Sequence, residues 1–116
     1  MKKEVAVSVK LVFAVVQNDD VKALTRALID HEISVTRISS TGGFLRGGNT
    51  TLMIGVEEER LETVLSDIKE KSSRRQTVTV PATSLPNPVG SAAIPVQIMI
   101  GGATVFIVNV EQFVKY

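Results

Sequence analysis

The 116-residue sequence predicts an α+β protein built as a ferredoxin-like βαββαβ sandwich. Short runs of β-branched and other apolar residues, typical of strands, alternate with segments whose apolar residues recur at helical spacing. Their order is strand, helix, strand, strand, helix, strand, and an extra C-terminal strand follows. Two strand–helix–strand units with right-handed crossovers place both helices on the same face of one sheet.

The first unit begins with a strand that is buried on both faces. Residues 11–16 form a continuous apolar run, which is typical of a central strand. Residues 1–9 alternate and form an N-terminal extension that either lengthens this strand or is partly ordered. Asn18 or Asp19 is the expected N-cap of a helix that ends near His31. We expect His31 to complement the helix dipole, and a role in a site is the alternative.

The second unit contains the next two strands and the second helix. Residues 33–40 and 50–56 are predicted strands, joined by the short glycine-rich loop 41–48. Arg74 and Arg75 follow the second helix and are interpreted as solvated charges near its end. The apolar stripe that predicts this helix consists of Leu61, Val64, Leu65 and Ile68.

The C-terminal part of the chain combines a proline-rich segment with further strands. Residues 74–93 form a long, flexible surface loop, which is either functional or a tolerated, disordered insertion. Residues 77–80 and 95–100 are short predicted strands. The glycines at 101–102 are expected to make a tight turn into the last strand, 103–110.

Composition and charge exclude several classes of function. The net charge of +1 argues against nucleic-acid polymers bound through phosphate neutralisation. The chain has no cysteine and a single histidine, so disulfides, thiolate metal sites and histidine clusters are excluded. The apolar run 11–16 is too short to cross a bilayer. We therefore expect one cytoplasmic domain, residues 1–116, with no metal and no membrane insertion.

The predicted strands carry more apolar residues than two short helices can cover. Exposed apolar sheet faces mark interfaces, so self-association is expected. The residues on which this expectation depends are Phe13, Val15, Ile54, Val56, Ile98 and Ile100.

The glycine-rich loop carries the residues best suited to binding a ligand. Two glycine pairs bracket Phe44, Leu45 and Arg46, and Asn49 follows. Phe44 offers a stacking face, glycine amides can surround an anion, and Arg46 adds a permanent positive charge. Asn49 can donate and accept together, as the N6/N7 edge of adenine requires. The alternative is a flexible hairpin loop whose Phe44 folds back on the core.

The same loop offers nothing for general acid–base catalysis. It contains no carboxylate, histidine or thiol, and such catalysis needs positioned groups with tuned pKa values. We therefore assign no catalytic residue and do not expect an enzyme.

Several motifs resemble the PII-like cyclic di-AMP receptor proteins of bacteria. The central motif, Thr-Gly-Gly-Phe-Leu-Arg-Gly-Gly-Asn-Thr-Thr at residues 41–51, is highly specific. Phe-Ala-Val-Val-Gln at 13–17, Gly-Val at 55–56 and Gly-Gly-Ala-Thr-Val-Phe at 101–106 reinforce it. The resemblance covers nearly all of residues 10–113.

The resemblance implies a PII-like homotrimer of ferredoxin-like subunits that holds cyclic di-AMP in clefts between neighbours, with no cofactor. Such a protein transmits a signal without catalysis, because the ligand reorders the loops 41–48 and 74–93 and so acts on a downstream partner. The sequence does not name that partner. The alternatives are a PII-like regulatory domain that senses another small effector, such as ATP, and a purely structural trimer.

The resemblance also implies which residues contact the nucleotide. Phe44 and Leu45 would hold one adenine, and Asn49 and Thr36 would hydrogen-bond to base or phosphodiester groups. Gly55 would leave room for the ring, and Arg46 would point at phosphate or at a structural partner. The full set is Thr36, Gly43, Phe44, Leu45, Arg46, Asn49 and Gly55, with Phe106 as a second-rank residue from the adjoining subunit.

Three positions depart from the pattern of the family. Relatives often have Asn and Arg at the positions of Glu32 and Ser34, and Gln near that of Lys115. The loss of a cation and the gain of Glu32 close to an anionic ligand are expected to weaken the attraction.

Overall fold

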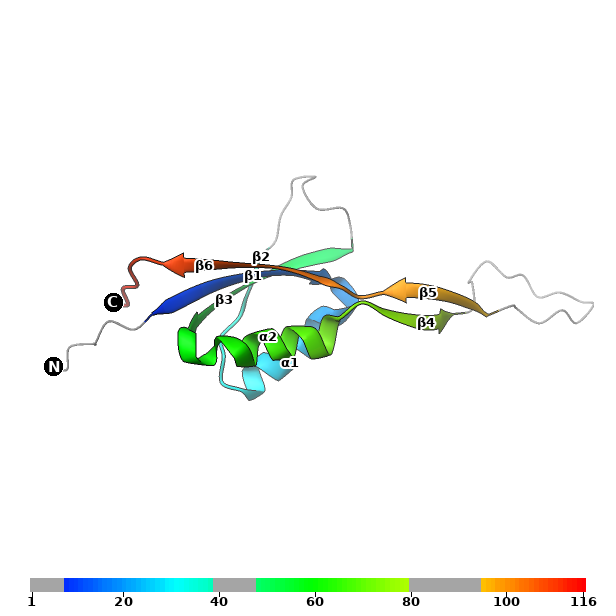
Figure 1. The fold of residues 1–116 in the computed structure, drawn as a ribbon, viewed down its shortest axis with the longest axis horizontal. Coiled ribbons are helices and arrows are strands. Elements are labelled where there is room, and N and C mark those ends of the chain that lie inside the picture. Colours follow the sequence, from blue (N-terminus) through cyan, green and yellow to red (C-terminus); the bar gives the residue numbers. More distant parts are fainter. Residues whose placement is uncertain (1–7, 39–47, 80–94) are drawn as a thin grey trace, which may run out of the picture.

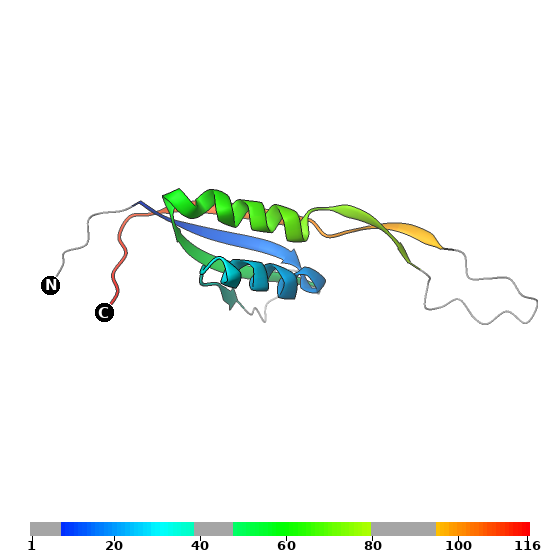
Figure 2. The ribbon, with the colours of Figure 1, turned by 90° about the horizontal axis from the view of Figure 1, so that it is seen from below.

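The computed structural model describes residues 8–38, 48–79 and 95–116. Two helices lie side by side against one face of a sheet, and a pair of strands projects from its end (Figures 1 and 2). The elements in chain order are β1 (Val9–Gln17), α1 (Asn18–Asp30), β2 (Thr36–Ile38), β3 (Asn49–Glu57), the 3-10 turn η1 (Glu58–Arg60), α2 (Leu61–Ser72), β4 (Arg75–Thr79), β5 (Val96–Ile100) and β6 (Ala103–Val110).

The main sheet has the strand order of a ferredoxin-like fold. Its four strands lie in the order β2-β3-β1-β6, and all three pairings are antiparallel. The first strand of the chain is therefore central, and β6 lies directly beside it at one edge. This arrangement confirms the predicted α+β, ferredoxin-like architecture.

Strand alternation divides the sheet into a covered face and an open face. Val12, Ala14 and Val16 of β1 are buried under the helices, whereas Phe13 and Val15 point to the other side and are half-buried. Ile54 and Val56, which we had counted among the residues needing cover, are buried under the helices. The core consists of Val12, Ala14, Val16, Val21, Leu24, Leu28, Ile33, Leu52, Ile54, Val56, Val64 and Ile68.

The last strand lies where it was predicted, at residues 103–110, but it is not an addition to the ferredoxin-like sheet. The last strand, β6, is the fourth strand of the main sheet, where it pairs with β1. The additional strands come before it: β4 and β5 pair with each other in a separate two-stranded sheet, called the ribbon below. Arg75–Thr79 form one strand of this ribbon, which confirms the short strand predicted at 77–80 and starts it two residues earlier, within the predicted loop 74–93.

The glycine turn before β6 is also different from the prediction. Gly101 and Gly102 do not close a hairpin, because β5 pairs with β4 while β6 pairs with β1. The chain passes from β5 into β6 in almost the same direction (Figure 1). Both glycines have positive φ, 80° and 107°, and the Gly102 N–H donates to the Ser72 carbonyl at 2.6 Å. They join the ribbon to the sandwich.

The ends of α1 differ from the sequence prediction in their details. Gln17, not Asn18 or Asp19, occupies the N-cap position and makes no side-chain cap, because β1 runs into α1 without a linker. At the other end, His31 contacts a neighbouring helix: its Nδ1 lies 2.7 Å from Oδ2 of Asp67 in α2. His31 therefore connects the two helices. No helix in the described part of the chain is long and apolar enough to span a membrane.

Candidate functional site

Half of the residues expected to bind a ligand lie in the described part of the chain. They are Thr36, Asn49, Gly55 and Phe106, and all four lie on strands of the main sheet. Gly43, Phe44, Leu45 and Arg46 lie outside the described residues. The part of the candidate site that the structure describes therefore lies on the sheet, where the strand register fixes which residues share a face.

The four residues belong to the open face of the sheet. Thr36 is opposite Met53, Met53 is opposite Phe13, and Phe13 is opposite Phe106, which gives one row across all four strands. Directly opposed residues share a face, so the half-buried Phe13 identifies this row as the side away from the helices. By alternation along β3, Asn49 and Gly55 lie on that side too.

The four residues are spread widely over this face. Asn49 and Gly55 are separated along β3 by roughly 20 Å, at about 3.3 Å per residue. Thr36 and Phe106 lie on opposite edge strands, which are separated by roughly 14 Å at about 4.8 Å per strand. A single chain therefore does not gather them into one pocket.

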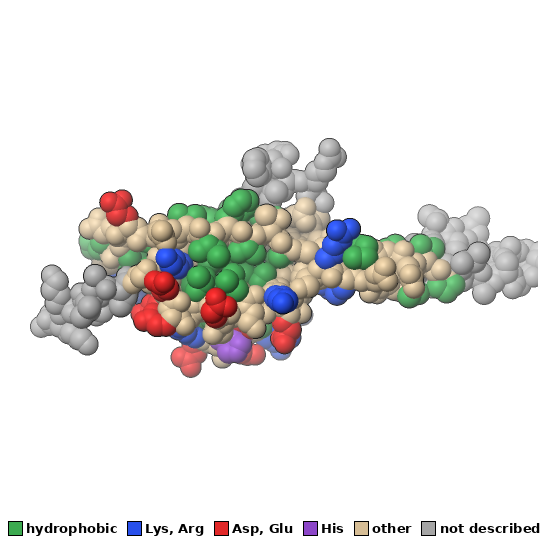
Figure 3. Space-filling view, viewed as in Figure 1, with side chains coloured by type: hydrophobic (Ala, Val, Ile, Leu, Met, Phe, Trp, Pro, Cys, Tyr) green, Lys and Arg blue, Asp and Glu red, His purple; other side chains and the backbone are tan. Residues whose placement is uncertain are grey.

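The open face is apolar and carries few charges. Figure 3 shows most acidic and basic side chains over the helix layer and hydrophobic side chains along the sheet and the ribbon. Phe106 is 56% exposed and Val108, two residues along the same strand, is 46% exposed. Exposed apolar area of this kind is expected where another molecule or another copy of the chain binds.

Among the described residues, nothing around Gly55 requires a glycine. Its backbone does not have positive φ, and a Cβ built on it would meet no atom of the described part of the chain within 4 Å. A glycine in the interior of a strand weakens that strand and often marks a place where another group approaches closely. In the described part of the chain, the open face is therefore unobstructed at Gly55.

Asn49 is held in place by both of its neighbours along the chain. The Gly48 carbonyl accepts a hydrogen bond from the Asn18 N–H at 2.7 Å. On the other side, the Thr50 hydroxyl donates to Oδ1 of Asn18. Asn18, which we had predicted as a helix cap, instead fixes the strand end that carries Asn49.

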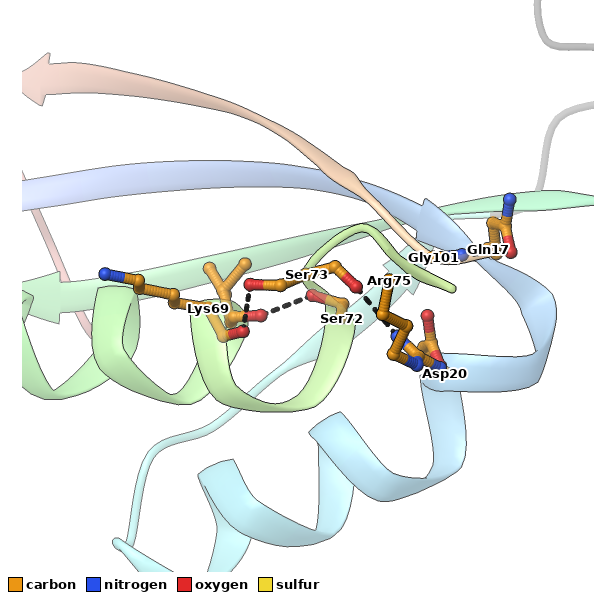
Figure 4. A network of polar contacts seen from close by, with 8 residues as sticks. Gln17, Asp20, Lys69, Ser72, Ser73, Arg75 and Gly101 are labelled. Atoms are coloured by element: carbon orange, nitrogen blue, oxygen red, sulfur yellow. Dashed lines mark hydrogen bonds and ion pairs between the residues drawn. The ribbon is translucent and has the colours of Figure 1, made fainter. Parts of the chain in front are cut away.

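A polar cluster that was not predicted from the sequence lies at the junction of β1 and α1. Gln17 Oε1 accepts a hydrogen bond from the Gly101 N–H at 2.8 Å, and Asp20 Oδ1 lies 2.7 Å from Arg75 Nη2 (Figure 4). We had interpreted Arg75 as a solvated charge and Asp20 was not singled out. The only signal in the sequence was Gln17, which closes the family motif at 13–17, because nothing local shows that partners 55 and 84 residues away meet here.

The three positions that depart from the family pattern are exposed. Glu32 follows α1 with φ 61°, and Ser34 precedes β2. Lys115 lies beyond β6 near the C-terminus. Glu32 belongs to a left-handed helix end, in which its N–H bonds to the Ile29 carbonyl and the Ile33 N–H bonds to the Leu28 carbonyl.

A groove on the helix side is lined by residues of α1 and the β2–β3 side of the sheet. It has a volume of about 820 Å³ and lies between α1 and β2, with Lys22, Arg26 and Arg37 among its lining residues. Thr36, Asn49, Gly55 and Phe106, the predicted binding residues that the structure describes, do not line it. This groove is therefore separate from the candidate site on the open face.

The fold and the placement of the described residues define a PII-like sandwich: a ferredoxin-like sheet with helices on one face and an open apolar face on the other. The family model of the cyclic-di-AMP receptor matches residues 9–116, and the chain belongs to this family. A crystal structure of a functionally unknown protein from Pediococcus pentosaceus ATCC 25745 is similar, with 40% sequence identity and a TM-score of 0.79. The match covers 96% of this chain and 100% of that one.

Proposed function

We propose that this protein is a non-enzymatic receptor that binds cyclic di-AMP between the subunits of a homotrimer. The observation that carries the proposal is the open face, on which Thr36, Asn49, Gly55 and Phe106 lie too far apart to form a pocket within one chain. A boundary between two chains brings the β2–β3 side of one sheet towards the β6 edge of another.

The chemistry of these residues suits a nucleotide with two adenines. Gly55 leaves room for a flat ring, and Phe106 offers an exposed aromatic surface on which a base stacks. The amide of Asn49 matches the donor–acceptor edge of adenine. The hydroxyl of Thr36, which is exposed, can bond to a base or a phosphodiester. Gly43, Phe44, Leu45 and Arg46 supply the remaining contacts in this proposal.

Signalling follows from a change in the loops when the ligand binds. The ribbon is a two-stranded sheet, which has little stability of its own. A segment of low local stability is easily biased by a ligand that prefers one of its conformations. We propose that the altered loop and ribbon are what a downstream protein recognises.

Isothermal titration calorimetry on the purified protein tests the ligand assignment. Cyclic di-AMP is expected to bind, and ATP at the same concentration is expected to give little heat. Binding of ATP without binding of cyclic di-AMP would favour the alternative, a PII-like domain that senses another effector. Detectable hydrolysis of cyclic di-AMP would contradict the non-enzymatic assignment.

Gly55→Val tests whether the open face is the binding face. No atom of the residues that the structure describes lies within 4 Å of a Cβ at Gly55, and valine suits strands, so the melting temperature of the ligand-free protein is expected to stay the same or rise. The affinity for cyclic di-AMP is expected to fall by about tenfold or more, about 1.4 kcal/mol. Unchanged affinity in Gly55→Val would place the nucleotide elsewhere.

A further inference from the structure

We propose that the β1–α1 junction, defined as Gln17, Asn18 and Asp20, couples the base of the glycine-rich loop to the base of the ribbon. This inference rests on the proposed function for its biological meaning, because it names how binding at the open face reaches the ribbon. The coupling itself is a property of the ligand-free chain. It can therefore be tested separately.

The junction fastens the strand end that follows the glycine-rich loop. Asn18 makes both contacts: its N–H donates to the Gly48 carbonyl at 2.7 Å, and its Oδ1 accepts from the Thr50 hydroxyl. Thr50 is buried, so its hydroxyl has no ready exchange with water. The position of Asn49, between Gly48 and Thr50, depends on these bonds.

The same junction fastens both strands of the ribbon. Asp20 pairs with Arg75 at the start of β4, with 2.7 Å between Oδ1 and Nη2. Gln17 Oε1 accepts the N–H of Gly101, directly after β5, at 2.8 Å. Figure 4 shows Gln17 and Asp20 at the beginning of α1, facing Gly101 and Arg75 at the point where the ribbon leaves the sandwich. Residues within one helical turn thus hold the start of β3, the start of β4 and the end of β5.

Gln17 lies between the candidate site and the ribbon. It is opposite Asn49 in the pairing of β1 with β3, on the open face, and its side chain reaches Gly101 on the other side. A shift of Gln17 away from Asn49 therefore strains or releases the Gly101 bond. We assign Gln17 as a positioning residue that fixes the spacing between Asn49 and the ribbon base.

The ion pair is suited to a two-state response. The Asp20 side chain is 6% exposed, and its Oδ2 has no hydrogen-bond partner among the described residues. Arg75 also donates to the Ser73 carbonyl at 2.9 Å, and it fills the space that a side chain on Gly101 would need. A buried carboxylate with one unsatisfied oxygen is held in place mainly by its cation, so loss of Arg75 leaves a buried charge without a partner. Attachment and release of the ribbon base are therefore distinct arrangements.

Hydrogen exchange on the ligand-free protein tests the coupling directly. Thr50→Val removes the bond to Asn18 at the loop base, and Thr50→Ser is the matched control that keeps the hydroxyl. In Thr50→Val we expect the amides of β4, β5 and Gly101 to exchange about 3- to 10-fold faster, the effect of one lost hydrogen bond. The Val64 and Leu65 amides in α2 are expected to change less. An equal change in α2, or none in the ribbon, overturns the proposal.

A second experiment connects the junction to the nucleotide. Cyclic di-AMP is expected to slow exchange in β4 and β5 of the natural protein and of the control Arg74→Gln, whose side chain forms no ion pair with a described residue. Arg75→Gln is expected to lose this slowing and to bind the nucleotide about 5-fold more weakly, since coupling is reciprocal.

The two proposals fail in different ways. If Arg75→Gln keeps the full ligand-dependent slowing, the junction does not transmit binding. If the natural protein does not bind cyclic di-AMP at all, the proposed function fails. The ligand-free Thr50 variants still decide whether the base of the glycine-rich loop is coupled to the base of the ribbon.

Discussion

The departure of Glu32 from the family pattern affects the backbone at the end of α1 as well as the charge near a ligand. It ends α1 with φ 61°, a region that costs most L-residues energy and that glycine and asparagine tolerate best. The Asn that relatives often carry at this position is therefore a natural helix terminator. The sequence alone suggested only an unfavourable charge near an anion.

Replacing Glu32 separates the effect of the backbone from that of the charge. Glu32→Gly is expected to raise the free energy of unfolding by about 0.5–1 kcal/mol, since the relief of left-handed strain exceeds the entropic cost of glycine. Glu32→Gln removes the charge but keeps the strain, so its stability is expected to stay within about 0.5 kcal/mol of the natural protein. Urea denaturation measures both. Equal stabilisation by the two variants would assign the cost to charge.

The sequence could predict which strand residues share a face of the sheet, because side chains along a strand alternate between its two faces. Thr36, Asn49, Gly55 and Phe106 were assigned to one site by resemblance, and the register places them on one face. Asp20 and Arg75 could not be foreseen. An acid in the first turn of a helix is already explained by the helix dipole, so the sequence gives no sign that it needs a distant arginine.

At the scale of elements, the sequence predicted strands better than it predicted their partners. Residues 95–100 and 103–110 both look like strands, and a glycine pair between two strands is typical of a hairpin. The hairpin does not form because the glycine N–H groups bond elsewhere, to Gln17 and Ser72. Strand pairing over long sequence separations depends on such tertiary bonds, which local patterns do not contain.

The two glycines at the ribbon base predict an unequal response to alanine. Both have positive φ, which costs an alanine about 1–2 kcal/mol, but only at Gly101 would a Cβ overlap the Arg75 guanidinium and the Ser73 carbonyl. Gly101→Ala is therefore expected to destabilise by about 2–4 kcal/mol once overpacking is added, and Gly102→Ala by about 1–2 kcal/mol. Thermal and urea denaturation measure the difference. Equal losses of stability would mean that Arg75 and Ser73 move away from the new Cβ at no energetic cost.

At the scale of the whole molecule, the main feature is that one apolar face of the sheet is uncovered in the single chain. The helices cover one side of the sheet only, and the described residues supply nothing that covers the other. The sequence predicted that one face would lack cover, but only two of the six residues named for it, Phe13 and Val15, lie on the open face. The others are buried under the helices or lie in the ribbon. What covers this face could not be derived from the sequence, because an apolar surface specifies burial and does not specify symmetry.

A pair of neighbouring residues on β6 tests whether this face is an interface between copies. Val108 lies opposite Leu11 on the open face, and Ile107 is opposite Val12 on the helix side; each is 46% exposed. Val108→Lys is expected to weaken assembly by more than about tenfold, because the interface would bury a charge, and Ile107→Lys is expected to leave assembly intact. Light scattering after size exclusion reports the mass. The opposite outcome would place the interface on the helix side.

The position of β6 beside β1 also has a consequence for how the protein is made. β6, which completes the sheet, is synthesised after β1, β2 and β3, and its partner β1 is synthesised before them. One side of the central strand of the growing polypeptide therefore stays unpaired until β6 has left the ribosome. Premature termination before residue 103 would release a product that cannot close its sheet.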